Sequence, residues 1–199
     1  MADFWSILCP GPSLRSATLP SEEHAIIAVN LAPLSKLPCN FWAVQDSLHR
    51  MQEVIESTIF KNKKPVVLCR EQEAGKWQEL GFPVWPHPNT DRAFAKFFPI
   101  LKNYDPTICY AGLSFTMAVV RAAAFGAKQI YVYGCDMAGY SYSYGKDWAN
   151  RPKEYWDERW AWEGKAVDRF LADIKSRGVS ITLVKGTNDG EEELSENWR

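Results

Sequence analysis

The chain has 199 residues, of which 46% are hydrophobic and 24% charged, and its formal net charge is -1. This length suits one well-packed domain and is too short for two ordinary ones, and the composition is that of a globular protein. The near-neutral charge gives no sign of a surface built to bind nucleic acid or an anionic membrane. No apolar run approaches the roughly 20 residues that cross a bilayer, so a membrane span is not expected.

The cysteines and the start of the chain both indicate a cytoplasmic protein. Residues 1–6 lack the basic start of a signal peptide. The five cysteines are odd in number and form no C-x-x-C pair; they are Cys9, Cys39, Cys69, Cys109 and Cys135. Each lies in or beside an apolar run, so we expect small buried hydrophobic residues in a reducing compartment and no zinc site.

Strands and helices alternate along the chain. Short apolar runs predict strands at 4–9, 25–29, 41–44, 65–69, 130–133 and 179–184. Apolar residues at helical spacing predict helices at 47–60, after Asp91 as a cap, at 115–125, and from about 156 to Gly178. The stretch 82–88 contains three prolines, which favour a loop or an edge element. This order predicts a single Rossmann-like α/β domain over 1–199, with a mainly parallel sheet and helices on both faces.

The segment from Tyr110 to Asp136 is the most informative part of the chain. Ser114 stands where a helix N-cap belongs, the following residues are apolar almost all round, and Gly126 is placed to end the helix. The run at 130–133 favours a central parallel strand that ends at Gly134. Ligands bind beyond the carboxyl ends of such strands and at helix N-termini, so this segment predicts where a ligand lies.

Small, amide and carboxylate residues follow nearly every predicted strand. They are Gly11, Pro12 and Ser13, then Asn30, Asp46, Gly134, Cys135 and Asp136, and finally 185–188. Glycines let a backbone approach phosphates, hydroxyls and N–H groups donate to them, and amides and carboxylates hold a base, a ribose or a divalent ion. Their convergence on one sheet edge predicts a nucleotide site.

Each of these residues also has an ordinary structural interpretation. Gly-Pro-Ser is common in turns, Asn30 and Asp46 could be turn or capping residues, and Ser114 could be only a cap. Neither a G-x-G-x-x-G nor a G-x-x-x-x-G-K-[ST] motif occurs, which disfavours a standard dinucleotide or P-loop site. The histidines are far apart in sequence, and only His49, close after Asp46, is expected near the site.

The segment at about 139–155 is interpreted as a lid. It follows Asp136 directly and mixes tyrosines with cations, among them Tyr144 and Lys146. Aromatic rings could stack on a sugar or base, and the cations could meet phosphate or carboxylate. Trp156 and Trp160 are expected instead to anchor the following helix in the core.

Several of these motifs together resemble a known group of proteins. They are Cys-Pro-Gly-Pro-Ser-Leu, the Ala-Val-Asn that ends at Asn30, Ala-Val-Gln-Asp at 43–46, and the block from Ser114 to Asp136. The chain looks like the MptE-like pterin pyrophosphokinases and, more distantly, the small bacterial sialyltransferases that modify lipo-oligosaccharide. The resemblance covers roughly two thirds of the chain in short, scattered motifs.

The resemblance implies roles for particular residues. Gly11, Ser13, Asn30 and Ser114 would contact a nucleotide donor, and Tyr144 would approach its phosphate. Asp46 matches the carboxylate of the pyrophosphokinase pattern better than the asparagine of the sialyltransferases.

The chain departs from the resemblance in the loop after the first predicted strand and in the residue that would act as general base. Cys9 and Pro10 replace a glycine and the residue after it, and no histidine occurs between Arg151 and Lys165, where the sialyltransferases carry their general base. Either another group, such as Asp157, Glu158 or Asp46, activates an acceptor hydroxyl, or the transferase activity is absent.

Three functions therefore remain open. The first is a nucleotide-dependent transferase, glycosyltransferase-like, with a nucleotide-sugar donor of the CMP type and with Asp46, Asp136 and Tyr144 as catalytic candidates. The second is an ATP-dependent pyrophosphokinase-like enzyme in which Asp46 and Asp136 would hold Mg²⁺. The third is a non-catalytic nucleotide-binding protein. No firm cofactor is expected, and the oligomeric state stays open.

Overall fold

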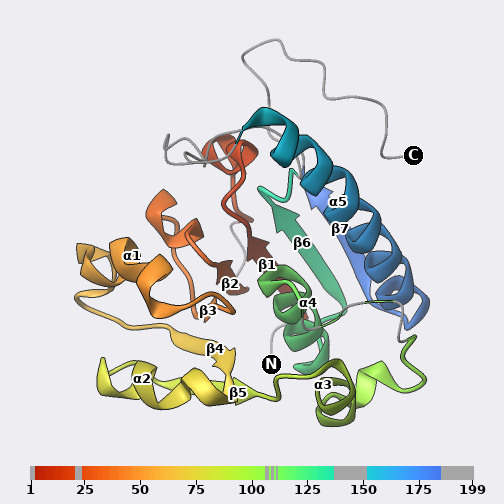
Figure 1. The fold of residues 1–199 in the computed structure, drawn as a ribbon, viewed down its shortest axis with the longest axis horizontal. Coiled ribbons are helices and arrows are strands. Elements are labelled where there is room, and N and C mark those ends of the chain that lie inside the picture. Colours follow the sequence, from red (N-terminus) through yellow and green to blue (C-terminus); the bar gives the residue numbers. More distant parts are fainter. Residues whose placement is uncertain are drawn as a thin grey trace.

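A computed structural model describes residues 3–20, 24–105, 108, 110, 112–136 and 152–184. The fold is a parallel sheet of seven strands in the order β5-β4-β3-β2-β1-β6-β7 (Figure 1). The strands are β1 (Phe4–Leu8), β2 (Ala25–Val29), β3 (Phe41–Ala43), β4 (Val66–Arg70), β5 (Val84–His87), β6 (Gln129–Tyr133) and β7 (Ser180–Val184). The α/β fold class expected from the sequence is confirmed.

Two layers of helices and turns cover the sheet. The α-helices are α1 (Gln52–Glu56), α2 (Ala74–Glu79), α3 (Asp91–Phe97), α4 (Ser114–Ala124) and α5 (Lys153–Ser176). The 3₁₀ helices are Pro12–Ser16, Ala32–Ser35, Leu48–Met51, Thr58–Phe60, Glu71–Glu73 and Pro99–Leu101. None of the helices in the described part of the chain is long and apolar enough to cross a membrane.

The core divides by sheet face, as the alternation of side chains along each strand requires. Trp5 and Ile7 of β1 point to a cluster that contains most of α4 and the buried side of α5. Leu8 points to the opposite cluster, which contains Trp42 and Trp77 and the helices α1 and α2. Helices on both faces are therefore confirmed, and α4, which is buried almost all round, packs over the middle of the sheet.

The strand order changes direction beside β1. The chain builds β2 to β5 on one side of β1 and then crosses to place β6 and β7 on the other side. The carboxyl ends of β1 and β6 therefore mark the switch point of the sheet, where open α/β sheets bind ligands. The strand at Gln129–Tyr133 is thus an interior strand between β1 and β7, whereas the middle strand of the sheet is β2.

Some local expectations are corrected. The helix expected over 47–60 is broken, because Ser57 is extended and its hydroxyl donates to the carbonyl of Val54 at 2.6 Å. The cap of α3 is Thr90, whose side chain accepts from the N–H of Ala93, and Asp91 is the first helical residue. The proline-rich stretch contains the strand β5, which tolerates Pro86 because it lies at the sheet edge.

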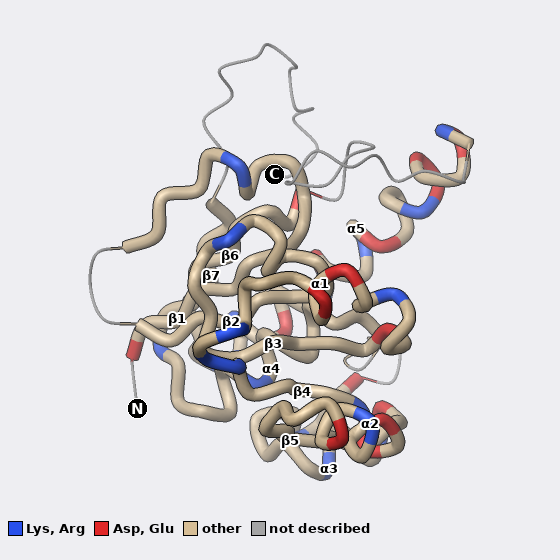
Figure 2. The backbone as a smooth tube through the Cα atoms, turned by 90° about the vertical axis from the view of Figure 1, so that its left-hand side faces the viewer, with Lys and Arg blue, Asp and Glu red and all other residues tan. Residues whose placement is uncertain are grey.

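Trp156 and Trp160 do not enter the core, contrary to expectation. Both are half-buried on α5 and stack on one another at 5.6 Å between ring centroids. The guanidinium of Arg159 lies over both rings and its Nε donates to the carboxylate of Glu163 at 2.7 Å. The buried side of α5 begins only at Glu163, because the first turns of the helix extend beyond the described body of the domain (Figure 2).

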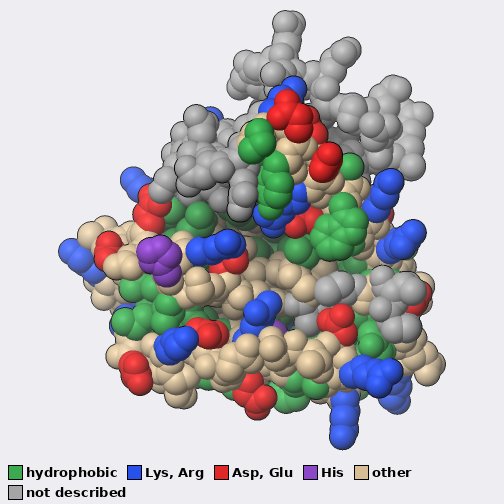
Figure 3. Space-filling view, viewed as in Figure 1, with side chains coloured by type: hydrophobic (Ala, Val, Ile, Leu, Met, Phe, Trp, Pro, Cys, Tyr) green, Lys and Arg blue, Asp and Glu red, His purple; other side chains and the backbone are tan. Residues whose placement is uncertain are grey.

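Charge is mixed over the described surface. Lysines and arginines alternate with acidic residues along the chain (Figure 2), and the face that carries α5 shows both signs among apolar side chains (Figure 3). Like the net charge, this gives no field of one sign that would attract a polyanion.

Candidate functional site

The loop after β1 and the end of β6 are joined directly at the switch point. The N–H of Gly11 donates to the carbonyl of Gly134 at 2.9 Å, and the N–H of Ser13 donates to a carboxylate oxygen of Asp136 at 2.9 Å. Hydrogen bonds therefore join the residues that follow β1 to the residues that follow β6. The carboxylate of Asp136 fixes the course of the loop after β1.

The close approach of the two strand ends requires both glycines. A Cβ on Gly11 would lie 2.4 Å from Oδ2 of Asp136 and 2.4 Å from the carbonyl oxygen of Gly134. Gly134 has a φ of +67°, and a Cβ there would lie 2.2 Å from the carbonyl oxygen of Cys9. No side chain fits at either position, and both glycines are buried, so they serve the tight packing of the two strand ends.

The thiol of Cys9 lies beneath this loop. Burial, together with a hydrogen bond to Cys135, raises the pKa of the Cys9 thiol well above its ordinary value. The thiol is therefore protonated and unreactive at neutral pH. Of the cysteines that the structure describes, Cys9 and Cys69 are buried, as expected, whereas Cys39 and Cys135 are half-buried.

Two buried polar atoms next to this loop have no hydrogen-bond partner in the described structure. They are the hydroxyl oxygen of Ser13 and Oδ1 of Asn30. Asn30 follows β2, the neighbour of β1, and its backbone is fixed in the left-handed region at φ 48° by two hydrogen bonds. Its N–H donates to the carbonyl of Ala43, and its carbonyl accepts from Nε1 of Trp42 at 2.7 Å. Orphaned buried polar atoms are rare in folded proteins, and they fit a site that a polar ligand completes.

Ser114 lies farther along the same edge but does not cap its helix. It is the first residue of α4, after Leu113, and its hydroxyl accepts from the backbone N–H of Gln45 at 3.0 Å. The capping role expected for Ser114 is therefore wrong, because the end of β3 reaches the hydroxyl instead.

Gln45 and Arg70 are polar residues of this edge that sequence reasoning missed. The side-chain amide of Gln45 donates to the carbonyl of Leu113 at 3.4 Å and accepts from Arg70 at 3.2 Å. The strand-end rule could have found both, since Gln45 follows β3 closely and Arg70 is the last residue of β4. The strand was instead predicted to end at Cys69, and Arg70 was overlooked.

Asp46 stands apart from Asp136. It follows β3, whereas Asp136 follows β6, and β2 and β1 lie between them. Three strand spacings of about 4.8 Å each place the two strand ends on the order of 14 Å apart. Asp46 pairs with Arg50 at 2.9 Å, and Arg50 is 70% exposed, so water weakens this pair. In the described ranges, no three His, Cys, Asp or Glu side chains gather as metal ligands.

Other predicted residues fall outside the site or outside the described residues. His49 lies in the 3₁₀ helix Leu48–Met51 and is exposed. The structure does not describe Tyr144, Lys146 and the rest of 139–151, nor does it describe 185–188. The end of the predicted lid, Lys153–Tyr155, belongs to α5.

Comparison with solved structures identifies a shared fold. No protein-family model matches the chain, and no curated protein is significantly similar to it. The chain superposes on the sialyltransferase CstII from Campylobacter jejuni in complex with cytidine-5'-monophosphate, with a TM-score of 0.54, at 19% identity, over 91% of this chain and 79% of CstII. The complexes of CstII with CMP-3FNeuAc and with CMP and a trisaccharide acceptor give TM-scores of 0.55 and 0.53 at 20% and 18% identity, over 91% of this chain in both cases and over 80% and 81% of CstII. At this identity the likeness establishes the fold.

Proposed function

We propose that this chain is a nucleotide-dependent transferase whose donor is a nucleotide sugar of the CMP type. The observation that carries the proposal is the joined loop at the switch point. Gly11 and Gly134 pack tightly together there, and the unpartnered side-chain atoms of Ser13 and Asn30 lie on the two adjacent strand ends. The fold shared with CstII, solved with CMP and a CMP-sugar analogue, supports a cytidine nucleotide as the ligand.

In this proposal the nucleotide occupies the edge above β1, β2 and β6. The unpartnered hydroxyl of Ser13 binds phosphate or ribose, since hydroxyls donate to such oxygens. Asn30 reads the nucleoside through its amide. Ser114, at the start of α4, lies on the side toward which the sugar extends.

The proposed chemistry is transfer of the sugar to an acceptor hydroxyl. Asp46 is the candidate general base, because its carboxylate is half-buried at the same edge and pairs with the solvent-exposed Arg50. Asp136 positions the loop through Ser13. Tyr144 would donate to the departing phosphate, where negative charge grows during the reaction. With Asp46 replaced by Asn, turnover should fall while donor affinity stays unchanged.

A panel of nucleotides tests the proposal directly. CMP, UDP, ADP and ATP are each added with and without Mg²⁺, and the thermal unfolding midpoint is measured. Stabilisation by CMP without metal is the expected result. Stabilisation by ATP only with Mg²⁺ would support the pyrophosphokinase alternative, and CMP binding without transfer to any acceptor would support a non-catalytic nucleotide-binding protein.

A further inference from the structure

Two thiols meet where β1 and β6 end. Cys9 directly follows β1 and Cys135 lies two residues after β6, and these strands are neighbours in the sheet (Figure 1). The side chains of the two cysteines are hydrogen-bonded to one another. Neither thiol has a part in the proposed function, and Cys9 stands where the proteins that the sequence resembles have a glycine. The pair is therefore a feature of this chain that the nucleotide site leaves unexplained.

The backbone places the two cysteines at the separation that a disulfide requires. The N–H of Cys9 donates to the carbonyl of Tyr133 at 2.8 Å, so Cys9 lies beside β6, and Cys135 is one residue beyond the position opposite Cys9. A strand spacing of about 4.8 Å and a rise of about 3.3 Å per residue put the two Cα atoms on the order of 6 Å apart. Disulfides span roughly 4.4–6.8 Å between Cα atoms, so the bond can form without opening the sheet.

Gly134 brings the two side chains to the same side of the sheet. Successive residues of a regular strand point to opposite faces, and by that rule Cys135 would point away from Cys9. The φ of +67° at Gly134 breaks the extended conformation directly before Cys135. Both cysteines pack against the core cluster that contains α4. The backbone turn at Gly134 therefore explains why the two thiols touch.

The two thiols differ in their access to solvent. Cys9 is only 4% exposed, and its raised pKa keeps it protonated, so a reagent in solution does not react with Cys9 first. Cys135 is half-buried. An oxidant therefore reaches Cys135 first, and Cys9 is held in contact with it as the second, resolving thiol.

We propose that Cys9 and Cys135 are a redox modification site, which closes to a disulfide when the chain meets a small disulfide such as oxidised glutathione. The sulfur of Cys135 attacks one sulfur of the glutathione disulfide, whose S–S bond breaks, and one glutathione leaves as a thiol with the proton of Cys135. Cys9 then attacks the sulfur of Cys135 in the mixed disulfide, and the second glutathione leaves with the proton of Cys9. The two protein thiols lose two electrons, and one glutathione disulfide becomes two glutathione thiols.

The disulfide joins the ends of β1 and β6 covalently. The loop that follows Cys9 is held to the end of β6 by the N–H groups of Gly11 and Ser13, which donate to Gly134 and Asp136. With the strand ends bonded, these two hydrogen bonds open less often. The inference concerns this loop and does not depend on which ligand binds beside it.

Oxidation of the folded chain in glutathione buffers tests the proposal. The protein is equilibrated with oxidised and reduced glutathione at several ratios, quenched with acid, alkylated, and digested without reduction for peptide mass spectrometry. We expect the peptide that contains Cys9 to be linked to the peptide that contains Cys135, with the loss of two hydrogen atoms and full reversal by dithiothreitol. The Tm of the oxidised chain should be higher by about 5–15 °C. The amide hydrogens of Gly11 and Ser13 should exchange more slowly by about threefold or more.

Single substitutions separate the roles of the two thiols. Cys9→Ala should stop with glutathione bound to Cys135, because the resolving thiol is missing. Cys135→Ala should leave Cys9 reduced, because the buried thiol does not meet the oxidant. Cys39→Ala is the control, since Cys39 is a half-buried cysteine that packs against the core cluster on the other face of the sheet. It should form the disulfide between Cys9 and Cys135 as the wild type does.

Other outcomes overturn the proposal. One is a wild-type chain in which glutathione stays on Cys135, or in which Cys9 and Cys135 remain thiols at every ratio. Another is a disulfide that contains Cys39, Cys69 or Cys109, which would assign the sensitivity to oxidation elsewhere. An oxidised chain with the Tm and the loop exchange of the reduced chain would show that the bond does not fix the strand ends. The wild type reports the linked peptides directly, so a variant that fails to fold leaves the test intact. None of these outcomes bears on the binding of CMP, and the proposed function is tested separately.

Discussion

The side chain of Asn30 offers a test of nucleotide binding that should spare the fold. Replacement by glycine keeps the left-handed backbone at φ 48° and removes the buried, unpartnered Oδ1. The free energy of unfolding should therefore change little. CMP affinity should fall about threefold to tenfold, since one hydrogen bond to a neutral partner contributes about 0.5–1.5 kcal/mol. Calorimetric titration measures the loss, and an unchanged affinity would place the nucleotide elsewhere.

The substitution Gly134→Ala tests whether the close approach of the ends of β1 and β6 contributes to the stability of the fold. In Gly134→Ala, the left-handed conformation costs about 1–2 kcal/mol and the clash with the carbonyl of Cys9 adds about 1–3 kcal/mol. Gly126→Ala is the matched control, because Gly126 also has a positive φ but its new Cβ would meet nothing within 4 Å. Denaturant unfolding should show the larger loss for Gly134→Ala, and equal losses would mean that the contact relaxes freely.

The identity of the site residues could be predicted from the sequence to the extent that they follow strands. That Gly11, Ser13, Asn30 and Gly134 lie at one edge of the sheet could be predicted because parallel strands bring their carboxyl ends together, whereas their part in ligand binding stays a prediction. The partner of Ser114 could not be found, because Gln45 is 69 positions away and only packing of α4 over β3 brings the two together. A serine before an apolar run looks the same in sequence whether it caps its helix or accepts from another element.

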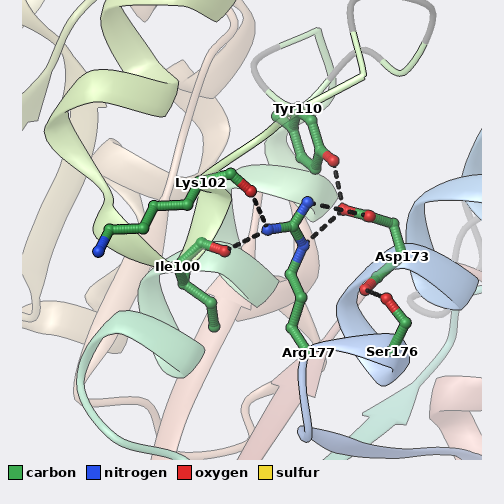
Figure 4. Close-up of polar contacts among 6 residues, drawn as sticks. All are labelled: Ile100, Lys102, Tyr110, Asp173, Ser176 and Arg177. Atoms are coloured by element: carbon green, nitrogen blue, oxygen red, sulfur yellow. Dashed lines mark hydrogen bonds and ion pairs between the residues drawn. The ribbon is translucent and has the colours of Figure 1, made fainter.

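At the scale of elements, Arg177 links the end of α5 to the loop before α4. Its guanidinium binds both carboxylate oxygens of Asp173 and also donates to the carbonyls of Ile100 and Lys102 at 2.7 and 2.6 Å (Figure 4). The hydroxyl of Tyr110 donates to the same carboxylate. The planar fork of arginine is what allows one side chain to join these elements.

Lysine cannot replace Arg177 in this arrangement. Arg177→Lys keeps the charge but cannot make all four hydrogen bonds, so we expect the free energy of unfolding to fall by about 2 kcal/mol. Arg169→Lys, at an exposed position of the same helix, should change it by less than about 0.5 kcal/mol. Chemical denaturation of both variants gives the comparison, and similar values would show that the contacts of Arg177 contribute nothing to stability.

His87 should make the stability of the edge strand depend on pH. Burial lowers the pKa of His87 from 6.5 to about 4, despite the hydrogen bond that its Nδ1–H donates to the carbonyl of Pro88. Between pH 4 and pH 6.5 the unfolded chain binds a proton that the folded chain does not. The contribution of neutral His87 to the free energy of unfolding is therefore complete above about pH 6.5 and is lost as the pH falls toward 4. The full effect is on the order of 3 kcal/mol.

Two substitutions isolate this effect. His87→Gln should flatten the fall in the free energy of unfolding between pH 6.5 and 4, whereas His49→Gln, at an exposed position, should leave the slope as it is in the wild type. Urea titrations at several pH values provide the slopes. A wild-type slope in His87→Gln would mean that other groups cause the pH dependence.

The strands could be predicted from the sequence more closely than the helices. Buried parallel strands appear as short apolar runs with turn residues after them, and β2 has the bounds that its run predicts. The helix expected at 47–60 fails because Ser57 gives the backbone another hydrogen bond, and the short α2 gave no signal that was recognised. Trp156 and Trp160 have the spacing of a buried face, yet α5 reaches the core only from Glu163 onward. Periodicity shows which side chains share a face, and not how far along the helix that face is covered.

At the scale of the whole molecule, the proposed nucleotide site joins the two parts of the sheet. β1 pairs with β2 on one side and with β6 on the other, and the loop after β1 is fixed to the end of β6. A ligand at the switch point would therefore contact both parts and stabilise the folded state only. At a hundredfold excess over its dissociation constant, CMP should add about 2.7 kcal/mol and raise the Tm by roughly 5–10 °C. Differential scanning calorimetry measures the shift, and Asn30→Gly should reduce it.

The last prediction concerns the segment 139–155, whose interpretation as a lid rests on its sequence. It follows closely after Asp136, which is fixed to the loop after β1, and its last three residues are the first of α5. A segment rich in Gly, Ser and Tyr beside a nucleotide site should exchange its amide hydrogens quickly without ligand and slowly when CMP is bound. Tyr144→Phe should lower turnover more than CMP affinity, because the hydroxyl would meet the charge that develops on the departing phosphate. Hydrogen exchange with and without CMP, combined with kcat and Kd for Tyr144→Phe, tests both expectations. Strong and equal protection in the two states would make the segment part of the folded core, and its aromatic residues would then serve packing.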